Sequence, residues 1–368
     1  MKTKYNNDSI IGGKNITASY TKNGELLRVM YPFPDFRSWI DEFKTGVKIN
    51  DSGIIYLHED INNQYNQYYT EDTNILHTEI TNTYFNLKIV QTDFVTIKED
   101  ILVKKYSFIN DSNIEQDIKF LIHSELLSDQ NNFISGMKLD NGMVQFAHDF
   151  SIATFSKLEK IFAGQINGTS NNIGSGIIGG KDYVGMSKDS GISFDIGKLP
   201  AGHRKDIEIC IYIDENKKTM HDFMDEVERI RKIDFNKELN DTKAYWRKYV
   251  KEHDGLKIKE PQNSYEEKIL NVYKRSILLF PLLTNHETGG VIAAPEIDEY
   301  FTKCGRYAYC WPRDAVFITK AMDILNMQKE TDKFYKKFCK MTQSKNGMWE
   351  QRFFSDGRLA PCWGYQID

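Results

Sequence analysis

The sequence predicts an antiparallel β-sandwich followed by a helical region. Up to about Ile213, apolar and polar residues alternate with a period of two, which is typical of half-buried strands. From Asp214 onward, apolar residues recur at helical spacing instead. Clusters of turn-forming residues separate the strand-like runs, and no helical pattern intervenes between them. This combination favours antiparallel sheets stacked as a sandwich, with helices after them.

Three runs carry the strand prediction most clearly. Apolar residues alternate with polar ones at Phe85, Leu87 and Ile89, and again over residues 118–122 and 207–213. No strict repeat of 20–50 residues is visible, which argues against a propeller or a solenoid. Asn, Asp, Gly, Ser and Pro mark the predicted turns, at residues 22–24, 110–113, 140–142 and 199–202.

The helical region begins with two amphipathic segments. Met220 to Ile233 carries apolar residues at helical spacing, and Trp246, Tyr249 and Val250 continue the pattern on a second helix. The polar residues 253–261 are typical of a linker. Ser264 and Glu267 then fit a capping box that opens a third helix. Further helices are predicted at about residues 314–326 and 330–342.

A long loop separates two of these helices. Residues 284–311 are rich in aromatic and small residues, so the loop is expected to be ordered and functional. Tyr307, Tyr309 and Trp311 directly precede Arg313 and Asp314. One interpretation is structural, with Asp314 capping a helix and pairing with Arg313. The other is a sugar site, in which rings face the C–H faces of a pyranose and the charged pair binds hydroxyls.

A second group of aromatic and polar residues lies near the end of the chain. It comprises Trp349, the Asp-Gly-Arg sequence at 356–358 and the Trp-Gly-Tyr-Gln-Ile-Asp sequence at 363–368. Taken alone, this group is more typical of a packed loop than of a binding site. It again places tryptophan beside polar groups, here amide and carboxylate side chains after a helix.

Composition excludes several classes of protein. Lysine and arginine total 48 and aspartate and glutamate total 52, a formal net charge of −4, which argues against a general nucleic-acid binder. Aromatic residues make up 13% of the chain, which suits both sheet packing and sugar stacking. The N-terminus lacks a secretory signal, and the longest apolar run, residues 277–283, is far below the roughly 20 residues of a membrane span.

Cysteine and histidine usage predicts neither disulfides nor a metal. The five cysteines are irregularly spaced with no CxxC motif, and the eight histidines are scattered with no HxxxH motif. Acidic residues show no calcium-loop spacing. We therefore expect reduced thiols in a cytoplasmic protein without a metal or another cofactor.

Three short motifs resemble glycoside hydrolase family 15, the glucoamylase and glucodextranase family. They are Gly-Val-Ile-Ala-Ala-Pro at 290–295, Tyr-Cys-Trp-Pro-Arg-Asp-Ala at 309–315 and the sequence at 363–368, in the family's order and at about its spacing. Residues 18–26 and the following Tyr31-Pro32 resemble the prokaryotic members. The resemblance covers essentially the whole chain.

This resemblance implies a domain organisation. A β-supersandwich would occupy residues 1–213, a helical linker 214–261, and the first helices of an (α/α)6 barrel 262–368. Only three of the family's twelve barrel helices would then be present. Such an incomplete barrel exposes apolar helix faces and would associate with a missing C-terminal half.

The resemblance also implies an activity and a binding site. Family members hydrolyse α-glucosidic bonds from a non-reducing end with inversion, and malto-oligosaccharides are the expected substrates. Trehalose and α-1,6-linked glucans are alternatives within the family. Arg313 and Asp314 match the pair that binds the terminal glucose hydroxyls, Tyr307 and Trp311 match aromatic residues lining that subsite, and Trp363 matches a tryptophan of the pocket wall.

The chain departs from the family in its catalytic carboxylates. An inverting glycosidase needs a general acid and a general base about 6.5–9.5 Å apart. In the family both lie beyond the segment that matches 363–368, so no residue of this chain is assigned a catalytic role. Glu296, Asp298 and Glu299 are interpreted as a solvated rim. The isolated chain is expected to be inactive, and a catalytically inert carbohydrate-contacting fragment or a non-enzymatic structural module remain alternatives.

Overall fold

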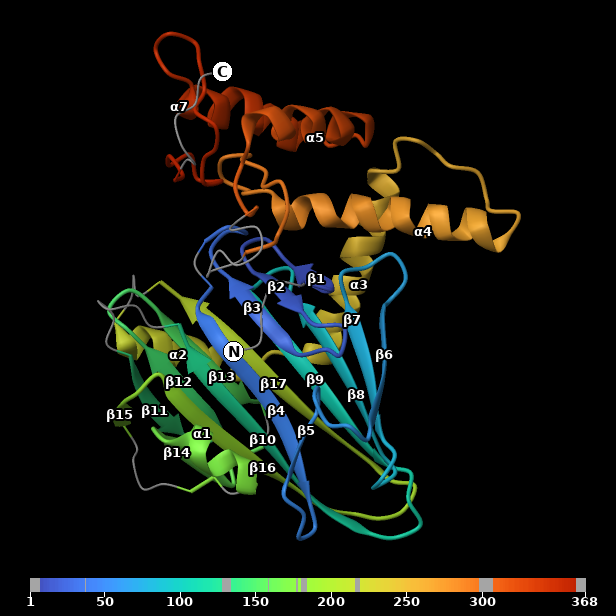
Figure 1. Ribbon diagram of the computed structural model, residues 1–368, viewed down its shortest axis with the longest axis vertical. Coiled ribbons are helices and arrows are strands. Elements are labelled where there is room, and N and C mark those ends of the chain that lie inside the picture. The colour runs from blue at the N-terminus through green and yellow to red at the C-terminus, as the bar shows by residue number, and fades with distance from the viewer. Residues whose placement is uncertain are drawn as a thin grey trace.

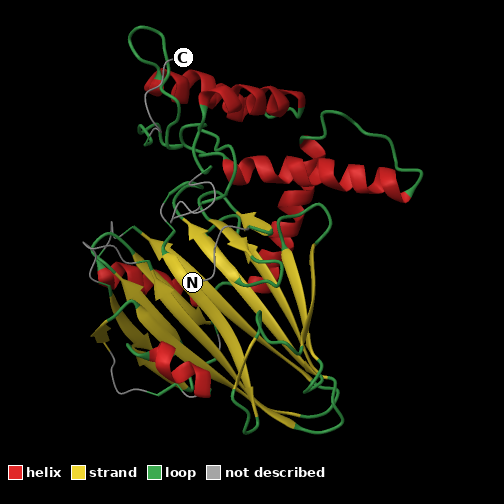
Figure 2. Cartoon of the chain, in the orientation of Figure 1, coloured by secondary structure: helices red, strands yellow, loops and turns green. Residues whose placement is uncertain are grey.

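Antiparallel sheets form the first part of the molecule and helices form the second (Figures 1 and 2). The computed structural model describes residues 7–36, 38–127, 134–157, 159–176, 178–179, 184–215, 219–297 and 307–361. All strand pairs within its sheets are antiparallel. The order of strands then helices agrees with the sequence-based expectation.

Three sheets contain the described strands. The small sheet has the order β1 (Ser9–Gly12), β2 (Thr17–Tyr20), β3 (Leu26–Met30). The five-stranded sheet has the order β14 (Ala163–Ile166), β16 (Asp189–Leu199), β10 (Gln116–Leu126), β4 (Ile40–Ile49), β5 (Ile54–Tyr56). The nine-stranded sheet has the order β15 (Val184–Met186), β11 (Ser135–Leu139), β12 (Gly142–Phe146), β13 (Ser151–Ser156), β17 (Arg204–Asp214), β9 (Ile101–Asn110), β8 (Leu87–Val95), β7 (Leu76–Asn82), β6 (Asn63–Tyr69).

The main core lies between the five-stranded and nine-stranded sheets. Alternate residues of β10, including Ile118, Phe120 and Ile122, are buried there against residues from β9 and β17. The ring of Phe120 contacts Tyr106 and Phe108 with centroid separations of 4.7 and 5.5 Å. The period-two pattern in the sequence therefore corresponds to strands with one face in this core.

Helices cover part of the outer face of each large sheet. On the nine-stranded sheet lie α2 (Met220–Arg231) and α3 (Phe235–Glu252), and Phe223 and Val227 pack against Phe155. On the five-stranded sheet lie α1 (Thr169–Asn172) and the 3-10 turn η1 (Ile173–Ser175), with Ile173 packed on Leu121. The expectation that no helix interrupts the strands was wrong here. The four residues of α1 are too few to show a helical period in the sequence.

The remaining helices follow α3. They are α4 (Ser264–Leu279), the 3-10 turn η2 (Phe280–Leu283), α5 (Pro312–Ile324), and a continuous helical run of α6 (Gln328–Lys333), the π-helical η3 (Phe334–Phe338) and α7 (Cys339–Thr342). Asn263 caps α4, since its side chain accepts hydrogen bonds from the backbone N–H groups of Tyr265 and Glu266. The predicted capping box at Ser264 was therefore one residue too late.

Direct contacts fix α4 and the loop after it to one end of the sandwich (Figure 1). Asn74 Nδ2 donates to the Leu278 carbonyl at 3.1 Å, and Lys274 pairs with Asp72 at 3.0 Å. Arg28, buried in the small sheet, donates to the carbonyl of Ile297 at 2.9 Å. Within the described residues, no helix has both the length and the apolar character needed to cross a membrane.

Candidate functional site

The loop after α4 begins with a tight turn around Asn285. Its Oδ1 accepts hydrogen bonds from the backbone N–H groups of Glu287 and Thr288, at 2.9 and 3.2 Å. Gly289 has φ +83°, and a Cβ there would lie 2.4 Å from the Phe334 backbone nitrogen. A Cβ on Gly290 would lie 2.4 Å from the Ser355 carbonyl oxygen. The two glycines therefore let this loop contact both the helical run after α5 and the C-terminal segment.

Backbone pairing places the aromatic segment next to this loop. The Ala293 N–H donates to the Tyr309 carbonyl at 3.0 Å. Cys310 and Phe353 form an antiparallel bridge with two hydrogen bonds of 2.8 Å. Tyr309 is buried, with its ring edge-to-face against Phe354 at a centroid separation of 5.3 Å. Segments far apart in sequence thus converge just before α5.

The first turn of helix α5 contains Arg313 and Asp314, the charged pair that the sequence analysis places at a helix start. Trp311 is the N-cap residue, with extended backbone and no side-chain capping bond, and Pro312 is the first helical residue. Asp314 lies in the first turn, where the helix dipole favours a carboxylate. It does not cap the helix; its Oδ2 lies 3.4 Å from an Arg313 guanidinium nitrogen.

The charged pair faces outward. The Arg313 side chain is 82% exposed and that of Asp314 is 41% exposed. Tyr307, which precedes them, is 44% exposed. The described residues therefore leave these groups accessible to a ligand and do not enclose them.

A buried cation, Arg352, lies against the aromatic rings that precede this pair. Arg352 is 1% exposed, and its guanidinium carbon lies 5.0 Å from the Trp311 ring centroid and 5.1 Å from that of Tyr309. Its Nε also donates to the carbonyl of Pro361. At these distances the cation attracts both rings. Arg352 therefore holds Trp311 from behind, which leaves its orientation at the start of α5 well defined.

Three buried polar atoms around this site lack a hydrogen-bond partner among the described residues. They are Glu296 Oε2, Trp311 Nε1 and Gln351 Oε1. Unsatisfied buried polar groups of this kind cost about 1–3 kcal/mol each. All three atoms are shielded from solvent, so a ligand at the start of α5 would reach them only after local rearrangement.

A buried hydrogen-bond network connects the site to the β-sandwich. Asp35, which is 1% exposed, accepts hydrogen bonds from the Ser355 backbone N–H and hydroxyl. The Ser355 carbonyl accepts a hydrogen bond from the Thr288 hydroxyl, at 2.5 Å. Asn285 Nδ2 donates to Ser355 Oγ at 3.3 Å. One serine thus ties the sandwich, the glycine loop and the C-terminal segment together.

Burial suppresses other reactive chemistry near the site. Desolvation raises the pKa of the Cys310 thiol, so it stays protonated at neutral pH and is a poor nucleophile. Desolvation, and then the nearby Lys333, lower the pKa of His286. Among the described residues here, the exposed polar groups at the start of α5 are therefore the ones available for ligand contact.

The structure brings four of the five predicted binding residues into one segment. Trp311, Arg313 and Asp314 lie at the beginning of α5, Tyr307 precedes them and is partly exposed, and Trp363 lies outside the described residues. Arg352 and Asp35 were missed. Arg352 follows two other polar residues, Glu350 and Gln351, and Asp35 lies in a distant turn of the sandwich, so no local pattern marks either one.

Sequence comparison finds a distant curated relative of this chain. No family model matches the chain. A curated relative, an uncharacterized glycosyl hydrolase of Methanocaldococcus jannaschii, is 24% identical over 359 residues, which are 95% of this chain and 55% of the relative. The chain therefore spans about half the length of that protein.

Two solved structures are similar in architecture. A bacterial glucoamylase complexed with acarbose superposes with a TM-score of 0.74 at 16% identity, covering 98% of this chain and 53% of that one. A proposed kojibiose phosphorylase from the human microbiome gives 0.52 at 14% identity, covering 76% and 39%. At these identities the similarity shows a shared fold, an antiparallel β-sandwich followed by helices.

Proposed function

We propose that this chain forms the sugar-binding part of a glycoside hydrolase of the glucoamylase type. The activity would be inverting exo-hydrolysis of α-glucosidic bonds in malto-oligosaccharides. The observation that carries the proposal is the start of α5, where Trp311, Arg313 and Asp314 offer an aromatic ring and an accessible charged pair together. The glycosyl hydrolase relative and the acarbose-bound glucoamylase with the same fold support it.

The proposed role of each residue follows from its chemistry. The Asp314 carboxylate would accept hydrogen bonds from two neighbouring hydroxyls of the terminal glucose, and Arg313 would donate to an adjacent oxygen. Trp311 and Tyr307 would face the apolar C–H surface of the ring. We propose Trp363 as a further wall residue. Arg352 would act as a positioning residue, since it contacts the Trp311 ring from within the protein.

We propose the domain division at residues 1–213, 214–261 and 262–368, with the last part belonging to an incomplete (α/α)6 barrel. Large apolar side chains on the exposed faces of α4 and α5 support this. Tyr265 is 72% exposed, Val272 68% and Phe317 72%. A complete barrel would cover such faces with further helices.

We assign no catalytic carboxylate to this chain. A general acid and a general base are each worth about 10²–10⁴-fold in rate, and we place both in the part of the enzyme that follows this segment. The described residues then bind and orient the terminal sugar. An inert carbohydrate-contacting fragment and a non-enzymatic structural module remain alternatives.

Glucose release from maltotriose, trehalose and isomaltose tests the proposal. For the isolated 368-residue chain we expect binding without hydrolysis, with maltotriose competing best against a labelled acarbose. Trehalose or isomaltose competing better would change the proposed substrate. Glucose release that Arg313→Ala abolishes would show that the chain carries its own catalytic carboxylates and would refute their placement elsewhere.

A further inference from the structure

Three carboxylates lie in one row across the five-stranded sheet. Glu125 on β10 is directly opposite Glu42 on β4 and, on its other side, directly opposite Asp189 on β16. Directly opposed residues of antiparallel strands point to the same face, and like charges there destabilise the pairing. A cation close to this row would therefore offset the repulsion between its carboxylates.

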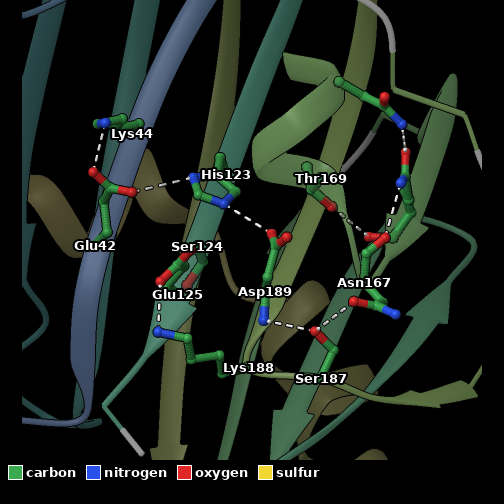
Figure 3. Close-up of polar contacts among 12 residues, drawn as sticks. Glu42, Lys44, His123, Ser124, Glu125, Asn167, Thr169, Ser187, Lys188 and Asp189 are labelled. Atoms are coloured by element: carbon green, nitrogen blue, oxygen red, sulfur yellow. Dashed lines mark hydrogen bonds and ion pairs between the residues drawn. The ribbon is translucent and has the colours of Figure 1, made fainter. Parts of the chain in front are cut away.

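His123 lies beside this row on the same face, two residues before Glu125 (Figure 3). The residue is 1% exposed. Its Nε2 lies 2.8 Å from Asp189 Oδ1. Its Nδ1 points toward Glu42 Oε2 at 3.7 Å, too far for a hydrogen bond, and has no hydrogen-bond partner among the described residues. A buried imidazole nitrogen is therefore aimed, unsatisfied, at a carboxylate.

Two lysines neutralise only part of the row. The Lys44 ammonium lies 2.5 Å from Glu42 Oε1, and the Lys188 ammonium lies 3.0 Å from Glu125 Oε2. The second oxygen of Glu42 is the one that faces His123. The lysines thus approach from outside the cluster and leave the space between the imidazole and the two glutamates to another cation.

We propose that Glu42, His123 and Glu125 bind a divalent transition-metal ion of the Zn²⁺ type. One donor atom from each residue lies within 4.8 Å of the others. The 3.7 Å between His123 Nδ1 and Glu42 Oε2 is the span of two bonds of about 2.1 Å meeting at an angle of about 120°. Small side-chain movements would bring a carboxylate oxygen of Glu125 within bonding distance of the same ion.

The partner of the imidazole supports this assignment. A metal-binding histidine characteristically donates its other N–H to a carboxylate, which fixes the tautomer and the ring orientation. Asp189 is positioned to accept from Nε2 in this way, which leaves Nδ1 to bind the ion. Asp189 would therefore be a positioning residue.

Ligand type and exposure narrow the choice of ion. An imidazole nitrogen with two carboxylates suits zinc and its neighbours, whereas calcium takes six to eight oxygen ligands. The Glu42 side chain is 34% exposed and that of Glu125 19%, so an ion can enter from solvent and keep water on its open side. Bound there, it would link β4 to β10.

Calorimetric titration of the chelator-treated 368-residue chain with Zn²⁺ tests the site, with Co²⁺ as a spectroscopic substitute. We expect one saturable site, visible Co²⁺ absorption bands, and at least a tenfold loss of affinity in both Glu42→Gln and Glu125→Gln. Glu79→Gln is the matched control, because Glu79 is a strand carboxylate paired with Lys88 at 3.1 Å and 29% exposed. It should bind Zn²⁺ like the wild type.

Glutamine has nearly the same shape as glutamate, and circular dichroism spectra of the two variants would check that they fold. Two outcomes would overturn the proposal. One is the absence of saturable Zn²⁺ and Co²⁺ binding, which would make the cluster a salt-bridge network with an imidazolium between Asp189 and Glu42. The other is saturable binding that neither glutamine variant weakens, which would place the ion elsewhere, such as at the cysteines.

Discussion

The Asp35 carboxylate accepts two hydrogen bonds from Ser355, a residue 320 positions later in the chain. Its Oδ2 lies 2.5 Å from the Ser355 backbone nitrogen, and its Oδ1 lies 2.5 Å from the Ser355 hydroxyl. Through this contact the β-sandwich holds the segment that packs behind the candidate sugar site. The sandwich is therefore part of the architecture of the site as well as a neighbouring domain.

Replacing Asp35 with asparagine tests the importance of that contact. The amide would present N–H groups to one of the two donors of Ser355, so the free energy of unfolding should fall by about 2 kcal/mol. Urea denaturation measures this change. Asp60→Asn is the control, because Asp60 is only partly buried and its carboxylate bonds only within its own turn in the described contacts; it should stay within about 0.5 kcal/mol of wild type. Equal effects of the two substitutions would contradict the role given to Asp35.

Arg352 offers a second test. Arg352→Met removes a buried cation from the Tyr309 and Trp311 rings, each contact being worth up to about 2 kcal/mol when desolvated. We expect the free energy of unfolding to fall by about 2–4 kcal/mol and acarbose binding to weaken at least tenfold. Arg358→Met is the matched control, since that guanidinium stacks on Phe354 at 5.1 Å but its side chain is 62% exposed. Unchanged acarbose affinity in a folded Arg352→Met protein would rule out a positioning role.

The buried imidazole of His286 predicts a pH dependence of stability. Burial, and then Lys333, lower its pKa from the ordinary 6.5, so the unfolded chain takes up a proton before the folded one does. Stability is then fully present above pH 6.5 and falls as the pH drops below that value. Denaturant midpoints measured between pH 5 and 8 should show the slope, and His286→Gln should reduce it. His221→Gln, at a histidine whose side chain is 85% exposed, should leave the slope unchanged. A slope that His221→Gln reduces and His286→Gln does not would contradict the role given to His286.

The exposed face of α5 predicts that replacing a large apolar side chain there costs little stability. Phe317 is 72% exposed, so Phe317→Ser should change the free energy of unfolding by no more than about 0.5 kcal/mol while lowering the binding of a hydrophobic dye. Phe334, which is 2% exposed, provides the contrast: Phe334→Ser should cost about 3–5 kcal/mol. Similar losses for both substitutions would mean that α5 is already covered in the isolated chain.

Sequence periodicity predicted the larger features of the fold. The change from period two to helical spacing at Asp214 coincides with the end of β17. A strand buries every second residue and a helix every third or fourth, so the pattern of apolar residues changes where one type of element gives way to the other. The short α1 was missed because it is too brief to show a period. The start of α4 was misplaced because Asn263 and Ser264 are both good caps, and only the backbone conformation distinguishes them.

The candidate site was partly predictable for a similar reason. Trp311, Arg313 and Asp314 are adjacent in sequence and sit together at one helix start. Arg352 and Asp35 reach the site only through tertiary contacts, which leave no local pattern. The cluster of Glu42, His123 and Glu125 was likewise missed, since its ligands sit on two strands paired across the sheet and match no contiguous metal motif.

Acarbose affinity of the Asp314→Asn variant tests the central claim most directly. The substitution keeps size and removes the charge that would accept the sugar hydroxyls, so calorimetry should show binding at least tenfold weaker than for the wild-type chain. Asp206→Asn is the matched control, because Asp206 also pairs with a nearby arginine, Arg204, at 2.7 Å, and it should bind like the wild type. Equal acarbose affinity in the Asp314→Asn variant and the wild type would contradict a sugar site at the start of α5.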